Sequence, residues 1–105
     1  MQKYTVFQIN LSNAQHNNNA IRELYLDTIM SPTDNRIAAA RDLYAKVAVI
    51  QADSLSQVFE IGNIGPEENI ERLAPMHSVS VGDVIVSDSG DAVYVAPVGF
   101  KAINF

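Results

Sequence analysis

Two histidines are the side chains best suited to acid–base chemistry near neutral pH in this sequence. His16 lies in the polar, Asn-rich stretch 12–19, where an exposed and inert side chain is the simpler interpretation. His77 stands directly before Ser78, but neighbouring residues of an extended chain point to opposite sides, so they do not form a nucleophile–base pair. A hydrolase with His77 as base would need a carboxylate or hydroxyl partner from elsewhere in the fold. We therefore predict no catalytic residues.

No residue spacing typical of a metal or phosphate site is present. The chain has no cysteine, which excludes disulfides, thiolate zinc sites and cysteine nucleophiles. Carboxylates that could join the histidines at a metal, such as Glu67 and Asp83, come from distant segments. Gly62 and Gly65 lack the Lys-Ser/Thr of a P-loop and the third glycine of a dinucleotide fingerprint. We expect no metal and no cofactor.

Negative charge is concentrated in the second half of the chain. The 105 residues carry 7 basic and 12 acidic side chains, a formal net charge of -5. Residues 1–52 hold five basic and four acidic side chains, whereas residues 53–105 hold two and eight. This balance excludes a protein that coats double-stranded nucleic acid, which needs a dense positive surface. A solvated acidic face is the simpler explanation, and an acidic surface that meets a partner protein is the alternative.

Two sets of residues are the candidate binding sites. The candidate protein-interaction surface combines an acidic helix start with an acidic hairpin: Glu67, Glu68, Glu71, Asp88 and Asp91. The glutamates also have a structural explanation, since acids in a first helical turn favour the helix dipole. The candidate small-ligand site combines four polar residues of the C-terminal segment: His77, Ser78, Asp83 and Tyr94.

Aromatic side chains offer a weaker nucleic-acid hypothesis. A single-strand binder stacks bases on sheet aromatics, and four are candidates for such a platform: Tyr4, Phe7, Tyr94 and Phe100. The basic groove that should accompany the platform is missing, because the C-terminal sheet region has only Lys101. Core or half-buried positions in the sheet are the better explanation of these aromatics.

Hydrophobic periodicity and turn residues predict the elements that position these groups. We expect them in the order strand 3–11, helix 20–30, helix 34–45, strand 47–50, helix 54–62, short helix 66–73, and strands 84–86, 92–96 and 98–103. Ser54 begins a capping box, and Gly62 is placed to end that helix. Asp88-Ser89-Gly90-Asp91 is the clearest hairpin signal, and Gly82-Asp83 predicts a tight turn.

These elements predict a single α+β domain spanning residues 1–105. Its antiparallel sheet should end in a C-terminal three-stranded meander and be covered by helices on one face. Its 48% apolar residues are enough for one hydrophobic core. The last strand follows Pro97 and ends in apolar Ile103 and Phe105, which makes a homo-oligomer plausible.

Nothing in the sequence indicates a membrane partner. The N-terminus lacks the long apolar stretch and small-residue cleavage site of a signal peptide. No apolar run approaches the roughly 20 residues of a membrane-spanning helix. We expect a cytoplasmic protein.

Three stretches carry a resemblance to known proteins. They are Phe59-Glu60-Ile61-Gly62-Asn63-Ile64-Gly65-Pro66-Glu67-Glu68, Met76-His77-Ser78-Val79-Ser80-Val81-Gly82-Asp83-Val84-Ile85-Val86, and Val95-Ala96-Pro97-Val98-Gly99-Phe100. Residues 45–105 resemble small uncharacterised proteins of tailed phages, cyanophages in particular. Residues 76–100 are similar to the YodL-like domain of phage and mobile-element proteins. The resemblance implies a phage-encoded accessory protein in the host cytoplasm and implies no activity.

The leading functional hypothesis is non-catalytic binding to a host or phage protein. The alternative is a module that binds a small ligand or single-stranded nucleic acid on the sheet face. A small hydrolase with His77 as base is the third hypothesis.

Overall fold

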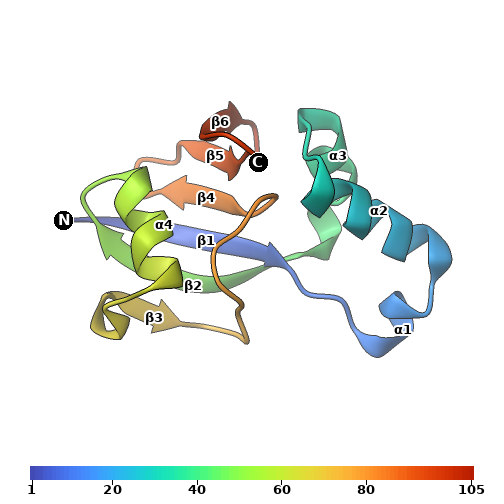
Figure 1. Cartoon of the computed structure of the whole chain (residues 1–105), viewed down its shortest axis with the longest axis horizontal. Helices are drawn as coiled ribbons and strands as arrows, with labels where there is room; N and C mark the ends of the chain where they lie inside the picture. The colour runs from blue at the N-terminus through green and yellow to red at the C-terminus, as the bar shows by residue number, and fades with distance from the viewer.

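Six antiparallel strands form one twisted sheet in the computed structural model, which describes residues 1–105 (Figure 1). The strands are β1 (Gln2–Ile9), β2 (Tyr44–Ala52), β3 (Ile70–Arg72), β4 (Val84–Ser87), β5 (Ala92–Val95) and β6 (Phe100–Ile103). Their order across the sheet is β3-β2-β1-β4-β5-β6, so the first strand of the chain lies near the middle. The predicted α+β class and the C-terminal meander β4–β5–β6 are confirmed.

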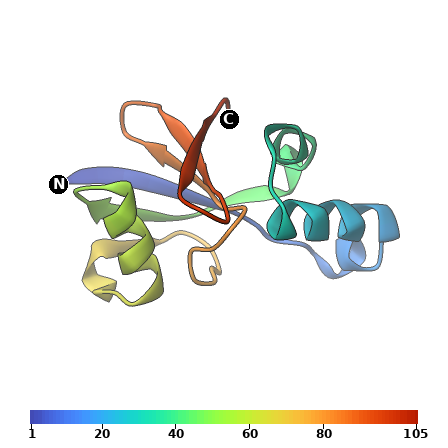
Figure 2. The same ribbon diagram turned by 45° about the horizontal axis from the view of Figure 1, so that its top comes forward.

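The helices divide into one that covers the sheet and three that extend beyond it. They are α1 (Asn13–His16), α2 (Asn19–Met30), α3 (Asp34–Ala39) and α4 (Leu55–Asn63). Helix α4 lies against one face of the sheet, whereas α1, α2 and α3 form an arm past one end of it (Figures 1 and 2). This arm contributes to the long axis of the molecule, whose extents are 41 × 25 × 21 Å.

The hydrophobic core has two parts, one on each face of the sheet. On the α4 face, Val58 and Ile61 of the helix pack with buried residues of four strands, β1, β2, β4 and β5. On the opposite face, Ile37 of α3 packs with Val84 and Tyr94. Because successive residues of a strand point to opposite faces, β5 serves both parts at once. The helical cover expected on one face is provided by α4, and α3 adds a contact on the other.

A β-bulge in β2 shifts the pairing register with β1 by one residue. Val6 of β1 pairs with Ala48, but the next residue, Phe7, pairs with Lys46. The extra residue, Val47, is therefore unpaired with β1, and both Val47 and Ala48 are fully buried. The Val47 carbonyl accepts backbone hydrogen bonds from residues 73 and 74, at 2.9 and 3.3 Å. A bulge thus turns two consecutive side chains into the core.

The predicted helix over 34–45 is too long. Helix α3 ends at Ala39, a 3₁₀ turn (η1, Arg41–Leu43) follows, and β2 begins at Tyr44. Tyr44 pairs with Ile9, so the sheet gains ladder hydrogen bonds that a continued helix would lose. The Tyr44 ring also packs edge-on against Phe105, with 5.3 Å between ring centroids.

The predicted helix over 66–73 is wrong. A single 3₁₀ turn (η2, Glu67–Asn69) leads directly into β3, which pairs with β2. The Asn69 side chain donates to the Gln51 carbonyl at 3.1 Å and holds this turn against the end of β2. Pairing with β3 satisfies the backbone N–H and C=O groups at the outer edge of β2, which a helix of two turns would leave without partners. In the same way, the predicted loop 12–19 contains the one-turn helix α1.

The glycine expected to end α4 has a different role. Gly62 lies within α4, and a Cβ there would stand 2.3 Å from the Val79 side chain. It therefore allows the segment between β3 and β4, residues 73–83, to cross close over the helix. We call this segment the crossover. The residue with positive φ after the helix is Gly65, at 108°.

Gly82, in the predicted turn at the end of the crossover, lies against the arm. Its φ is 91°, and a Cβ there would meet the Ile29 Cα and the Thr28 carbonyl oxygen of α2, both at 3.1 Å. Gly90 in the β4–β5 hairpin has almost the same φ, 92°, but no atom within 4 Å of a Cβ. The two glycines therefore share a backbone conformation, but the α2 backbone lies against Gly82 and no other part of the chain lies against Gly90.

We expect Gly82→Ala to destabilise the fold more than Gly90→Ala. Both variants force an alanine into positive φ, at about 1–2 kcal/mol, and only Gly82→Ala also displaces the α2 backbone, adding about 1–3 kcal/mol. Urea unfolding of the two variants beside the parent measures the difference. Equal losses would show that α2 does not press on this turn.

Candidate functional site

The side chain of Gln8 is a polar group completely buried between the sheet and the crossover. It is 0% exposed and lies on the α4 face of β1, after Tyr4 and Val6. Its Nε2 donates to the His77 carbonyl at 2.9 Å and to Asp83 Oδ2 at 3.0 Å. Its Oε1 accepts from the His77 backbone N–H at 3.2 Å. One amide therefore joins the central strand to both halves of the crossover.

Asp83 is a buried carboxylate at the end of the crossover. It is 3% exposed, and its Oδ2 accepts from the Ser80 N–H at 2.9 Å as well as from Gln8. Burial raises the pKa of Asp83 to about 6, and the hydrogen bonds from Ser80 and Gln8 and the nearby His77 limit the rise. The carboxyl group therefore titrates close to neutral pH.

Tyr44 approaches the same turn from β2. Its hydroxyl donates to the Gly82 carbonyl. Burial raises the pKa of Tyr44 strongly, and the negative charge of Asp83 adds to the rise. The phenol is therefore a fixed hydrogen-bond donor to the turn.

The His77 ring lies outside this network, although its backbone belongs to it. The side chain is exposed, and Nδ1 stands 2.7 Å from the Ser78 carbonyl oxygen. A carbonyl accepts only, so Nδ1 donates its proton in this contact. Ser78 is exposed and contributes only this backbone contact. The ring forms no hydrogen bond with a hydroxyl and no ion pair with a carboxylate.

The predicted ligand set is divided between the two faces of the sheet. His77, Ser78 and Asp83 belong to one continuous segment, whereas Tyr94 lies in the opposite core with Ile37 and Val84. Burial raises the pKa of Tyr94, and the neighbouring Asp34 carboxylate adds to the rise. The aromatic platform is divided in the same way: Tyr4 and Phe100 lie on the α4 face, and Phe7 and Tyr94 on the other.

The predicted acidic surface lies in two separate places. Glu67 in η2 binds the Arg72 guanidinium through both carboxylate oxygens, which lowers the Glu67 pKa. Glu68 and Glu71 are exposed beside it, at the β3 edge. Asp88 and Asp91 are exposed in the β4–β5 hairpin. Four strand spacings separate β3 from β5, roughly 19 Å, so these acids do not form one patch.

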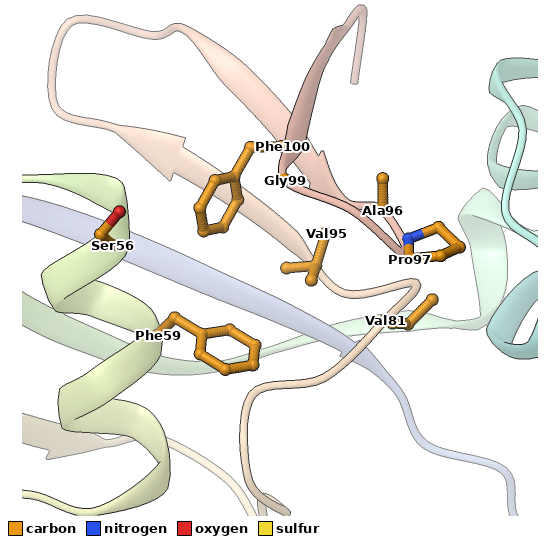
Figure 3. Close-up of a pocket in the computed structure, with 8 residues that line it drawn as sticks. All are labelled: Ser56, Phe59, Val81, Val95, Ala96, Pro97, Gly99 and Phe100. Atoms are coloured by element: carbon orange, nitrogen blue, oxygen red, sulfur yellow. The ribbon is translucent and has the colours of Figure 1, made fainter.

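An apolar groove lies between α4 and the β5–β6 turn. It has a volume of about 290 Å³ and is lined by Ser56, Phe59, Val81, Val95, Ala96, Pro97, Gly99 and Phe100. Figure 3 shows the Phe59 and Phe100 rings on its two sides, with Val95 between them. We call it the Phe59–Phe100 groove. Phe59 follows Leu55 by four residues, the spacing of one helix face, but 39% of Phe59 is exposed because α4 covers β2 more closely than β5.

No group of three or more His, Asp or Glu side chains lies close enough together to hold a metal ion. None of the helices combines the length and the apolar character needed to cross a bilayer. Comparison of the chain with protein-family models, curated proteins and solved structures gave no match.

We expect Gln8→Met to destabilise the protein by about 2–4 kcal/mol, because it keeps the side-chain length and removes three hydrogen bonds to buried or half-buried groups. Asn10→Ala is the control, since Asn10 is exposed and its side chain donates only to the Pro75 carbonyl of the same crossover. Asn10→Ala should lower the free energy of unfolding by less than about 1 kcal/mol. Chemical unfolding measures both, and equal losses would contradict the central role of Gln8.

We expect the stability of the parent relative to Asp83→Asn to rise as the pH falls from 7 to 4. The folded-state pKa of Asp83, about 6, lies above its ordinary value of 3.8, so the folded state binds the proton more tightly. The stabilisation is complete below pH 4 and is lost as the pH rises through 6, by up to about 3 kcal/mol. Unfolding curves across this range give the difference.

Asp88→Asn controls for the loss of one acidic side chain, since Asp88 is exposed in the hairpin. A parent–Asp83→Asn difference that stays constant from pH 4 to 7 would show that the buried carboxyl group does not titrate there.

Proposed function

We propose that this chain is a non-catalytic module that binds a segment of a partner protein in the Phe59–Phe100 groove. The observation that carries the proposal is the groove itself, an open apolar recess between a helix and the last hairpin of the sheet. Aromatic and aliphatic side chains exposed in a concave surface are typical of sites that bury a partner's side chain. The nearby turn residue Val98, which is 89% exposed, extends this apolar surface.

Backbone hydrogen bonds fix the floor of the groove at Val95 to the end of the crossover. Val95 lies at its base, and its backbone donates to the Asp83 carbonyl at 2.9 Å and accepts from Gly82 at 2.8 Å. These bonds tie the floor to the end of the crossover, whose Val81 also lines the groove. A binding site that is already formed loses little conformational entropy when a partner binds.

The biological setting that we propose is a phage-encoded accessory protein, whose partner is a host or phage protein in the host cytoplasm. Support for this setting comes from the resemblance of residues 45–105 to tailed-phage proteins. The groove residues Val95 to Phe100 lie within one of the resembling stretches.

We expect Phe59→Ser to weaken partner binding by about tenfold or more, because it removes one wall of the groove. Peptides selected from a displayed random library against the parent protein serve as ligands, and fluorescence anisotropy measures their affinity. Phe59 is partly exposed, so the variant should keep the circular dichroism spectrum of the parent.

The control is Met30→Ser, which removes a large apolar side chain from α2, where Met30 is 76% exposed. Its affinity for the selected peptides should equal that of the parent. Selected peptides that ignore Phe59→Ser, or a library that yields no binder, would contradict the proposed function.

A further inference from the structure

Strand β6 presents the open edge of the sheet beside the Phe59–Phe100 groove. It is the last strand in the order β3-β2-β1-β4-β5-β6, and only β5 pairs with it. In an antiparallel ladder, alternate residues direct their N–H and C=O groups to each side. The outward groups of β6 therefore have no strand partner, and its middle residues Lys101 and Ala102 are exposed.

The opposite edge of the sheet is much less suited to a further strand. Strand β3 has three residues, and exposed Glu71 and Arg72 are two of them. Short, charged edge strands are a common protection against pairing with another chain. Strand β6 has four residues with a single charge, Lys101, and contains no proline. The sheet therefore leaves one edge open to another strand, and it is the edge beside the groove.

Residues of β6 on the α4 face connect the edge to the groove. Phe100 pairs with Val95 and forms one side of the groove, and Ala102 pairs with Val93, on the same face. A strand added to β6 would direct every second side chain to this face. A large apolar side chain opposite Phe100 would pack against the outer side of the Phe100 ring, at the rim of the groove, and the small Ala102 leaves space for the next one.

The far end of β6 is acidic. A second recess, of about 450 Å³, lies there and is lined by two carboxylates, Asp34 and Asp91, beside Ala92, Ala102 and Ile103. Asp91 also lines a third recess, which reaches Leu55 at the start of α4. No lysine or arginine lines any of these three recesses. A bound chain thus meets apolar surface at one end of β6 and negative charge at the other.

We infer that the partner is an extended peptide segment that joins β6 as a seventh strand, with a large apolar side chain packed against Phe100 at the rim of the Phe59–Phe100 groove and a Lys or Arg that reaches Asp91 past the end of β6. Asn104, which lines the acidic recess just after β6, is four positions from Phe100, about 14 Å at strand spacing. The basic residue therefore lies about four positions from the apolar one. This inference rests on the proposed function, since it identifies the segment that the groove binds.

The ion pair between the basic peptide residue and Asp91 is tested with the selected peptides in a double-mutant cycle. Replacing the peptide's Lys or Arg with Gln should weaken binding to the parent about three- to fivefold, the effect of one exposed ion pair. The same replacement should have little effect on binding to Asp91→Asn. Asp88→Asn is the matched control, because Asp88 lies in the same hairpin and lines none of the three recesses; this variant should keep the full effect.

Strand addition is tested by N-methylation of the same peptides, one residue at a time. Methyl groups on the amides that face β6 should weaken binding about tenfold or more, and those on the alternating amides should not. Peptides that depend on Phe59 but show no basic preference and tolerate every N-methyl group would overturn this inference alone. The absence of any Phe59-dependent peptide would overturn the proposed function as well.

Sedimentation of the protein without peptide tests whether a second copy occupies the edge. A monomer is expected. A dimer that Lys101→Pro disrupts would overturn the inference, because a second copy of the chain would then be the added strand.

Discussion

The side-chain amide of Gln8 connects the central strand β1 to the crossover that carries the chain from β3 to β4. The two strands joined by the crossover lie on different sides of the β2–β1 pair, so the crossover has to pass over the sheet. It contains no regular secondary structure that would satisfy its own backbone groups. Gln8 supplies a donor and an acceptor at one end of it, and Asp83 supplies acceptors at the other. The position of β4, and hence of the whole meander, depends on this network.

The same network determines the shape of the groove. Asp83 and Gly82 exchange backbone hydrogen bonds with Val95, so the end of the crossover is continuous with the floor of the groove. A buried carboxylate is costly without a cation, and Asp83 has two hydrogen-bond donors rather than an ion pair. Polar groups in the core thus fix the backbone on which an apolar binding surface is built.

Local signals in the sequence predicted the local structures. The hairpin at Asp88–Asp91, the cap at Ser54 and the turn at Gly82 each depend on neighbouring residues, and each is found. Strand β3 and the start of β2 could not be predicted from their own residues, because pairing with distant strands decides them.

The groove and the Gln8 network escaped prediction for related reasons. Gln8 lies on the face of β1 whose residues become polar toward the end of the strand, which is the pattern of a solvent-facing position. Only the crossover, about 70 residues later in the chain, buries it. Phe59 has the spacing of a core residue, and only the displacement of α4 from β5 leaves it open.

The central position of β1 has a consequence for synthesis. Tyr4 pairs with Ile50 on one side and with Ser87 on the other, so the first strand made needs the last third of the chain to complete its pairing. At ribosomal rates of about 5–20 residues per second, the second edge of β1 stays open for roughly 4–16 s after the strand emerges. For most of that interval a β1–β2 pair has two uncovered edges, because β3, which covers the outer edge of β2, is also made late. Nascent chains are therefore exposed to mispairing for longer than a chain with strands in sequential order.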